Sequence, residues 1–173
     1  MFVVCMGDGL GNQMFHYAFY CALAENYPNN TVLANIEDFY GSLNLHNGYE
    51  LERIFGIKVK ECSHFEALML ADYNPNCTKK NRFINQIFKY RKEIFGPKES
   101  YITVDDPTVY YNEVFQLSPL RSYMFRGNWI NEKYFKNVKE KLLSDFTFPV
   151  IEDEENLEIV KRKYFPVKPF GYA

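Results

Sequence analysis

The opening of the chain alternates short apolar runs with turn residues. Residues 2–6 (FVVCM) form a continuous apolar run that ends at glycines, which is typical of a central strand buried on both faces. Residues 14–23 are apolar on most sides and contain no proline or glycine, so they predict a largely buried helix. Residues 31–34 (TVLA) predict a second strand after a proline turn. This order favours two parallel strands joined by a right-handed crossover.

The periodicity is weaker in the middle of the chain. Residues 49–55 and 63–71 predict two short helices, and residues 81–95 predict a longer one that carries several basic side chains. Between these segments the sequence does not indicate where further strands lie.

A second strand-to-helix step follows towards the end. Residues 122–125 predict an apolar strand, Gly127 a turn, and residues 131–146 a helix on the sheet surface. This helix is expected to place its apolar side chains on one face: Tyr134, Phe135, Val138, Leu142 and Leu143. The alternation predicts an α/β fold, a Rossmann-like doubly wound parallel sheet that binds ligands at the carboxyl ends of its strands.

Length and composition fit one globular domain. The chain has 173 residues, of which 47% are hydrophobic and 24% are charged. We expect residues 1–150 to form the α/β domain and residues 151–173 to act as a linker. The acidic run at residues 152–155 is interpreted as a solvated helix start, because carboxylates favour the positive end of a helix dipole.

Charge and hydropathy exclude two classes of partner. The formal net charge is -2 with acids and bases well mixed, which gives no basic patch for nucleic acid. No run approaches the ~20 apolar residues that a membrane-spanning helix needs, and the first strand begins too early to leave room for a signal peptide. We therefore expect a cytoplasmic protein, with peripheral contact at the inner membrane face left open.

No metal or redox site is predicted. The cysteines have no CxxC spacing, and the histidines have no metal-ligand spacing to cysteines or carboxylates. We expect free thiols at all four cysteines: Cys5, Cys21, Cys62 and Cys77.

The glycine-rich turn after the first strand is the main functional signal. Residues 7–18 read GDGLGNQMFHYA, in which Gly9 and Gly11 allow close approach of a ligand and Asn12 is placed to cap the helix. Free N–H groups at a helix start favour a phosphate. The glycines do not match the G-x-G-x-x-G fingerprint, and no GK[ST] follows. A tight strand-to-helix connection without a ligand is an equally good interpretation.

This turn also carries a family resemblance. GLGNQMFHYAFYCALAE at residues 9–25 closely resembles the opening signature of family 11 fucosyltransferases, GGLGNQMFQYAFGRALA. Residues 49–57 (YELERIFGI) are similar to the family's YELDRFNI element, and residues 127–148 are similar to its GYWQSEKYF segment and following helix. The three elements occur in the family's order, so the resemblance extends to about residue 150.

The resemblance implies an activity and an architecture. In such enzymes fucose moves in one inverting displacement from GDP-fucose to the 2-hydroxyl of a galactoside, without a metal or another cofactor. Two domains of a GT-B-like fold close over the donor, and this chain resembles the N-terminal one. The expected partners are therefore a sugar nucleotide and a galactoside glycan; the oligomeric state is not indicated.

Candidate site residues follow from the resemblance and from strand position. By similarity the cleft loop contains Gly9, Gly11, Asn12 and Gln13, and Asn12 is the preferred ligand contact. Arg126 is expected at the end of a parallel strand, where ligands bind, and is the most plausible basic contact.

Three aromatic or imidazole side chains have competing interpretations. His16 lies one turn into the helix, where a packed or hydrogen-bonded histidine is commoner than a catalytic one. Trp129 and Tyr134 fit a stacking surface for a sugar, although core packing is the favoured interpretation.

Two departures from the family pattern bear on activity. Asp8 replaces a residue that is more usually glycine, and a carboxylate beside an anionic donor is expected to point away from it. The family's HxRRGDY segment, whose arginine holds the donor phosphate, has no counterpart, so no catalytic residue is assigned. The chain is therefore expected to be truncated, with weak or absent transfer and an exposed apolar aromatic surface. The alternatives are a noncatalytic acceptor-binding remnant and a nucleotide-binding regulatory domain.

Overall fold

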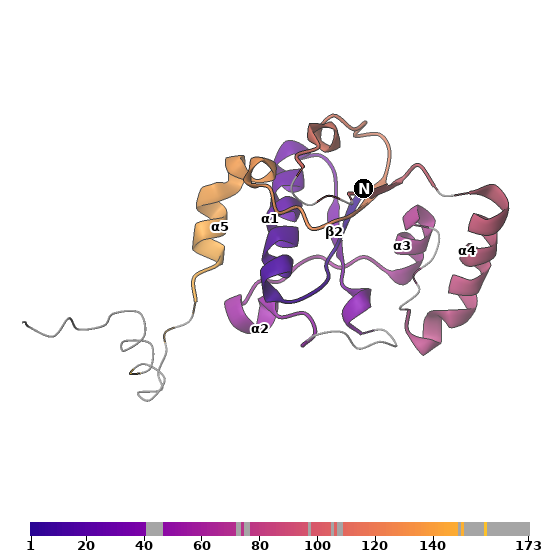
Figure 1. The fold of residues 1–173 in the computed structure, drawn as a ribbon, viewed down its shortest axis with the longest axis horizontal. Coiled ribbons are helices and arrows are strands. Elements are labelled where there is room, and N and C mark those ends of the chain that lie inside the picture. The colour runs from indigo at the N-terminus through magenta and orange to yellow at the C-terminus, as the bar shows by residue number, and fades with distance from the viewer. Residues whose placement is uncertain are drawn as a thin grey trace, which may run out of the picture.

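A four-stranded parallel sheet organises the chain, as a computed structural model shows (Figure 1). The structure describes residues 1–40, 47–71, 74, 77–96, 98–104, 106, 109–148, 150 and 158. The strand order is β2-β1-β4-β3. Their bounds are β1 Phe2–Cys5, β2 Val32–Asn35, β3 Tyr101–Thr103 and β4 Tyr123–Arg126.

The described residues form five α-helices and five short 3₁₀ turns, most of which lie between the strands. The helices are α1 Leu10–Asn26, α2 Leu51–Phe55, α3 His64–Ala71, α4 Arg82–Phe95 and α5 Lys139–Asp145. The 3₁₀ turns are η1 Glu37–Phe39, η2 Lys79–Asn81, η3 Asn112–Phe115, η4 Glu132–Tyr134 and η5 Lys136–Val138. No described helix is long and apolar enough to cross a membrane.

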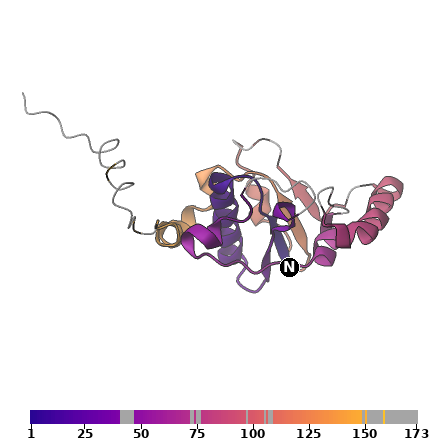
Figure 2. The ribbon, with the colours of Figure 1, turned by 90° about the horizontal axis from the view of Figure 1, so that it is seen from below.

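Helices cover both faces of the sheet, as expected for a doubly wound fold. Alternate side chains of β1 point to opposite faces. Phe2 and Val4 pack in one core that includes α1, whereas Val3 and Cys5 pack in another that includes α3. The turned view shows α1 and α3 on opposite sides of the sheet (Figure 2). The α/β fold class is therefore confirmed, and it is compatible with a Rossmann-like domain.

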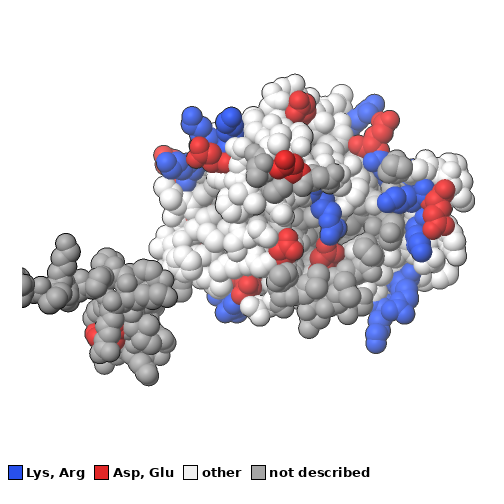
Figure 3. Space-filling model, viewed as in Figure 1, with Lys and Arg blue, Asp and Glu red and all other residues white. Residues whose placement is uncertain are grey.

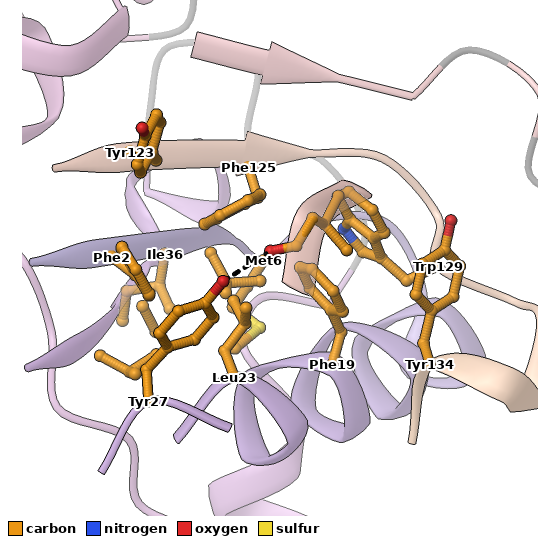
Figure 4. Packing of buried hydrophobic residues seen from close by; sticks show 14 of the residues in the cluster. Phe2, Met6, Phe19, Leu23, Tyr27, Ile36, Tyr123, Phe125, Trp129 and Tyr134 are labelled. Atoms are coloured by element: carbon orange, nitrogen blue, oxygen red, sulfur yellow. Dashed lines mark hydrogen bonds between the residues drawn. The ribbon is translucent and has the colours of Figure 1, made fainter. Parts of the chain in front are cut away.

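An aromatic cluster joins α1 to the sheet (Figure 4). Phe19 of α1 stacks on Trp129, with ring centroids 3.9 Å apart and an interplanar angle of 7°. Tyr134 meets the edges of both rings. All three side chains are buried, so core packing is the correct interpretation of Trp129 and Tyr134, and a sugar-stacking surface is not.

Strands β1, β2 and β4 and helices α1 to α4 lie close to their predicted positions. Helix α1 begins at Leu10, with Gly9 as its N-cap residue and no side-chain cap. The prediction that Asn12 caps the helix is therefore wrong. Its side-chain amide instead donates to Asp8 Oδ2 over 3.4 Å, from within the first turn.

The helix expected over residues 131–146 is wrong in its first half. Asn131 Oδ1 accepts from the backbone N–H of Lys133 and starts a 3₁₀ turn, and Phe135 then leaves helical geometry at φ -128°. Helix α5 begins only at Lys139, and this break leaves Leu143 exposed instead of on the buried face.

The remaining sequence predictions have different outcomes. The four cysteines are free, as predicted. Strand β3 was not predicted, because three half-exposed or exposed residues at a sheet edge give no continuous apolar run. The predicted linker, including the acidic run, lies outside the described residues except for Glu158.

The stack on Trp129 gives a stability prediction. Replacing buried Phe19 by alanine leaves a cavity against the indole ring, so we expect Phe19→Ala to lower the free energy of unfolding by about 3–5 kcal/mol. Phe83→Ala makes the same chemical change at an exposed position of α4 and should change it by less than about 0.5 kcal/mol. Urea unfolding of both variants measures the difference, and equal effects would contradict the assigned core.

Candidate functional site

A pocket of about 330 Å³ lies at the carboxyl ends of the parallel strands. Its walls come from the turn after β1, the residues after β4, the end of β3, and η1. This is the edge of an open α/β sheet where ligands bind. The polar and charged side chains that line it are Asp8, His16, Asp38, Thr103, Arg126 and Asn128.

Two of the predicted site residues meet in this pocket, and four do not. His16 and Arg126 line it. Gly9 and the half-exposed Asn12 lie beside it at the start of α1, and Gly11 faces an apolar hollow on the other side of the helix. Ligand contact by Gly9, Gly11 and Asn12 stays a prediction.

Gln13 is fully buried and holds two segments together. Its Nε2 donates to the backbone oxygens of Asp8 (2.9 Å) and Gly48 (3.0 Å), and its Oε1 accepts from the backbone N–H of Glu50 over 2.8 Å. The amide therefore satisfies three backbone groups. In this structure Gln13 has no surface to offer a ligand, and it fixes the turn that shapes the pocket.

His16 joins the turns on either side of the pocket. Its Nδ1 accepts from the backbone N–H of Gly7 over 3.2 Å, which places the proton of the neutral ring on Nε2. Burial lowers the pKa of His16 to about 4, although Asp8 and hydrogen bonds with the Gly127 backbone and the Asn128 side chain act in the opposite direction. The imidazole is therefore neutral near pH 7. The packed interpretation of His16 agrees with this geometry.

Arg126 is held at the mouth of the pocket by a carboxylate. The Arg126 Nη2 donates to Asp38 Oδ2 over 3.3 Å, and Asn74 Nδ2 also donates to the Asp38 carboxylate over 2.9 Å. The Arg126 side chain remains half exposed and can meet a ligand. Sequence reasoning missed Asp38, although it follows β2 just as Arg126 ends β4, so the same strand-end rule identifies both.

The pocket has a mixed charge with a small acidic excess. Among its described lining residues Arg126 is the single base, whereas Asp8 and Asp38 supply two carboxylates. Asp8 is held at φ +61°, a left-handed conformation that favours glycine. The backbone therefore gives a physical reason why the related signature usually has glycine at this position.

Two other chemistries find little support in the described residues. Burial raises the pKa of the Cys5 thiol to about 12, so this pocket residue is not a thiolate nucleophile near pH 7. The residues that the structure describes contain no cluster of three or more side chains suited to a metal ion.

Gly127 makes a close approach on the opposite wall. A Cβ added here would lie 3.1 Å from both the Cβ and the carbonyl oxygen of Val104. The lack of a side chain therefore lets the turn after β4 pass beside the residue that follows β3, and this contact shapes the pocket wall.

An apolar hollow lies apart from the pocket, between α1 and α5. It measures about 420 Å³ and is lined mainly by Met14, Phe15, Phe135, Leu143 and Phe146. The hollow is an apolar aromatic surface, and the expectation that a second domain covers such a surface stays a prediction.

The buried amide of Gln13 predicts that a change from amide to carboxylate destabilises the fold at this position but not at an exposed one. Gln13→Glu would direct carboxylate oxygens at two carbonyls, so we expect the free energy of unfolding to fall by about 3 kcal/mol or more. Gln86→Glu is the matched control, because it makes the same chemical change at an exposed position of α4. Urea titration measures both, and a stable Gln13→Glu variant would contradict the network.

The lowered pKa of His16 predicts a pH-dependent stability. The unfolded state binds a proton near pH 6.5 and the folded state only near pH 4, so this contribution is complete above about pH 6.5 and is lost as the pH falls towards 4. It amounts to at most about 3 kcal/mol. Unfolding free energies measured over this range should fall more steeply for the wild type than for His16→Gln. Equal slopes, or an NMR titration midpoint of the His16 ring near 6.5, would refute the assignment.

A comparison with known proteins identifies one curated relative. The chain is similar to an α-1,2-colitosyltransferase of Escherichia coli, with 29% identity over 145 residues that cover 84% of this chain and 44% of the relative. The chain thus spans less than half the length of that enzyme. No protein-family model and no solved structure matches this chain. The likeness supports a relation to glycosyltransferases, and membership of family 11 stays a prediction.

Proposed function

We propose that this chain is the acceptor-binding side of a glycosyltransferase that transfers fucose from GDP-fucose to the 2-hydroxyl of a galactoside. The observation that carries the proposal is the pocket at the carboxyl ends of β1 and β4, next to the turn that resembles the fucosyltransferase signature. The similarity to a transferase that forms an α-1,2 linkage supports the same reaction type. The name of that relative makes colitose the second donor sugar to test.

The charges of the pocket fit a sugar better than a diphosphate. Sugar hydroxyls both donate and accept hydrogen bonds, and the pocket offers carboxylates at Asp8 and Asp38 together with donors at Arg126 and Asn128. A diphosphate would face two carboxylates and one guanidinium that is already paired with Asp38. We therefore assign the pocket to the acceptor.

The transfer step needs groups of two kinds. The acceptor hydroxyl attacks the anomeric carbon and loses its proton, while the bond to the phosphate oxygen breaks and the nucleoside diphosphate leaves with its charge. Asp8 and Asp38 are the carboxylates that the pocket offers as a base. The leaving phosphate needs positively charged groups beyond Arg126, which the resemblance places in the HxRRGDY segment. Transfer by this chain alone is therefore expected to be weak or absent.

A nucleotide-binding role is the second candidate, and one observation favours it. Helix α1 begins at Leu10 after Gly9, which has no side chain to cap it, and the N-terminus of a helix is a position that suits a phosphate. A GDP site there would lie beside the pocket.

Ligand titration separates the two candidates. We expect methyl β-galactoside to bind, and Arg126→Ala to weaken it about tenfold because a charged donor at the pocket mouth is lost. Arg121→Ala is the matched control, since this exposed arginine lies near the amino end of the same strand. NMR titration measures both affinities, and transfer of labelled fucose from GDP-fucose, or of colitose from its activated form, measures activity.

The outcomes are distinct. Galactoside binding that depends on Arg126 supports the acceptor site. GDP binding without galactoside binding favours the nucleotide-binding role, and binding of neither ligand contradicts both.

A further inference from the structure

Helix α4 carries an apolar stripe that faces solvent. Phe83, Ile87, Tyr90 and Ile94 are spaced by four, three and four residues, which places them on one face of the helix. Their exposed fractions are 81%, 52%, 57% and 73%. Four large apolar side chains in line on one exposed helix differ from the singly scattered ones that are normal on protein surfaces.

The opposite side of α4 is the one that packs on the protein. Phe88 meets Phe65 of α3 edge-on, with ring centroids 6.4 Å apart. Asn85 is buried, and its side chain exchanges two hydrogen bonds of 2.7 Å with the backbone of Asn74. These contacts fix the rotation of the helix, so the stripe is held outward and does not reach the core.

The segment around the stripe is strongly basic. Residues 79–98 contain seven lysines and arginines and one acid, a net charge of +6, whereas the rest of the chain has a net charge of -8. The expectation that acids and bases are well mixed along the chain is therefore wrong for this segment. Blue side chains gather at the edge of the molecule where α4 lies (Figure 3). The exposed bases Lys79, Lys80, Arg82 and Lys89 belong to this segment.

We propose that α4 is a peripheral anchor that lies on an anionic lipid surface, with its stripe among the acyl chains and its bases at the headgroups. An amphipathic helix with large apolar side chains on one face and bases beside them has the composition of such anchors. This proposal is independent of the pocket and its ligand.

Charge and side-chain chemistry argue against two other occupants, a second copy and nucleic acid. A second copy docked through the same face would bring two segments of +6 together. Nucleic acid would use the bases but leaves the aliphatic side chains of Ile87 and Ile94 without a role. An anionic bilayer is complementary to both the charge and the apolar stripe.

Vesicle binding by the full chain tests the proposal. We expect sedimentation with phosphatidylcholine vesicles that contain phosphatidylglycerol, little with phosphatidylcholine alone, and release at high salt. The double variant Phe83→Ser with Ile94→Ser should bind about tenfold less because it removes apolar area from the stripe. Leu120→Ser is the matched control, since Leu120 is 95% exposed in the segment before β4, outside α4, and the substitution should leave binding unchanged.

A second measurement reports insertion directly. Trp129 is the single tryptophan of the chain and is buried, so its emission should not respond to brominated lipids. A Phe83→Trp variant adds an indole to the stripe, and its emission should be quenched. Absence of vesicle binding by the wild type, equal binding by the double variant, or self-association that the double variant abolishes would each overturn the proposal.

Discussion

Two buried polar side chains on one face of α1 determine the shape of the pocket. Gln13 and His16 are three residues apart, so both point from the helix towards the turns at the carboxyl edge of the sheet. Gln13 holds the backbone of Asp8, and His16 accepts from the backbone of Gly7. Because an unpaired buried amide or imidazole costs stability, these bonds help to specify the conformation of the turn.

The sequence predicted the elements that bury continuous apolar runs. Strand β1 is apolar at every position because α1 covers one of its faces and α3 the other. Among the described residues, strand β3 pairs with β4 alone and contains no fully buried residue, so no apolar pattern marks it. The predicted helix over residues 131–146 is interrupted at Phe135, whose φ of -128° lies outside helical geometry, and apolar periodicity does not register such an interruption.

The sequence predicted those site residues whose position depends on the end of a strand. It did not predict the role of a residue whose hydrogen-bond partners lie far away along the chain. Arg126 could be placed because it ends a strand, and Asp38 obeys the same rule after β2. Gln13 was assigned to the cleft loop by its resemblance to the family signature. The hydrogen-bond partners of Gln13 at Gly48 and Glu50 lie more than thirty residues away in the sequence. Only the folded chain shows that the Gln13 amide is hydrogen-bonded to them.

The exposed stripe and the pocket are connected through rigid elements. Lys98, just beyond α4, donates to the carbonyl oxygens of Leu68 and Met69 at the end of α3, and β3 begins three residues later. The last residue of β3, Thr103, lines the pocket. A surface bound by α4 would therefore set the orientation of the carboxyl edge of the sheet, because no described segment between them is long enough to uncouple the two.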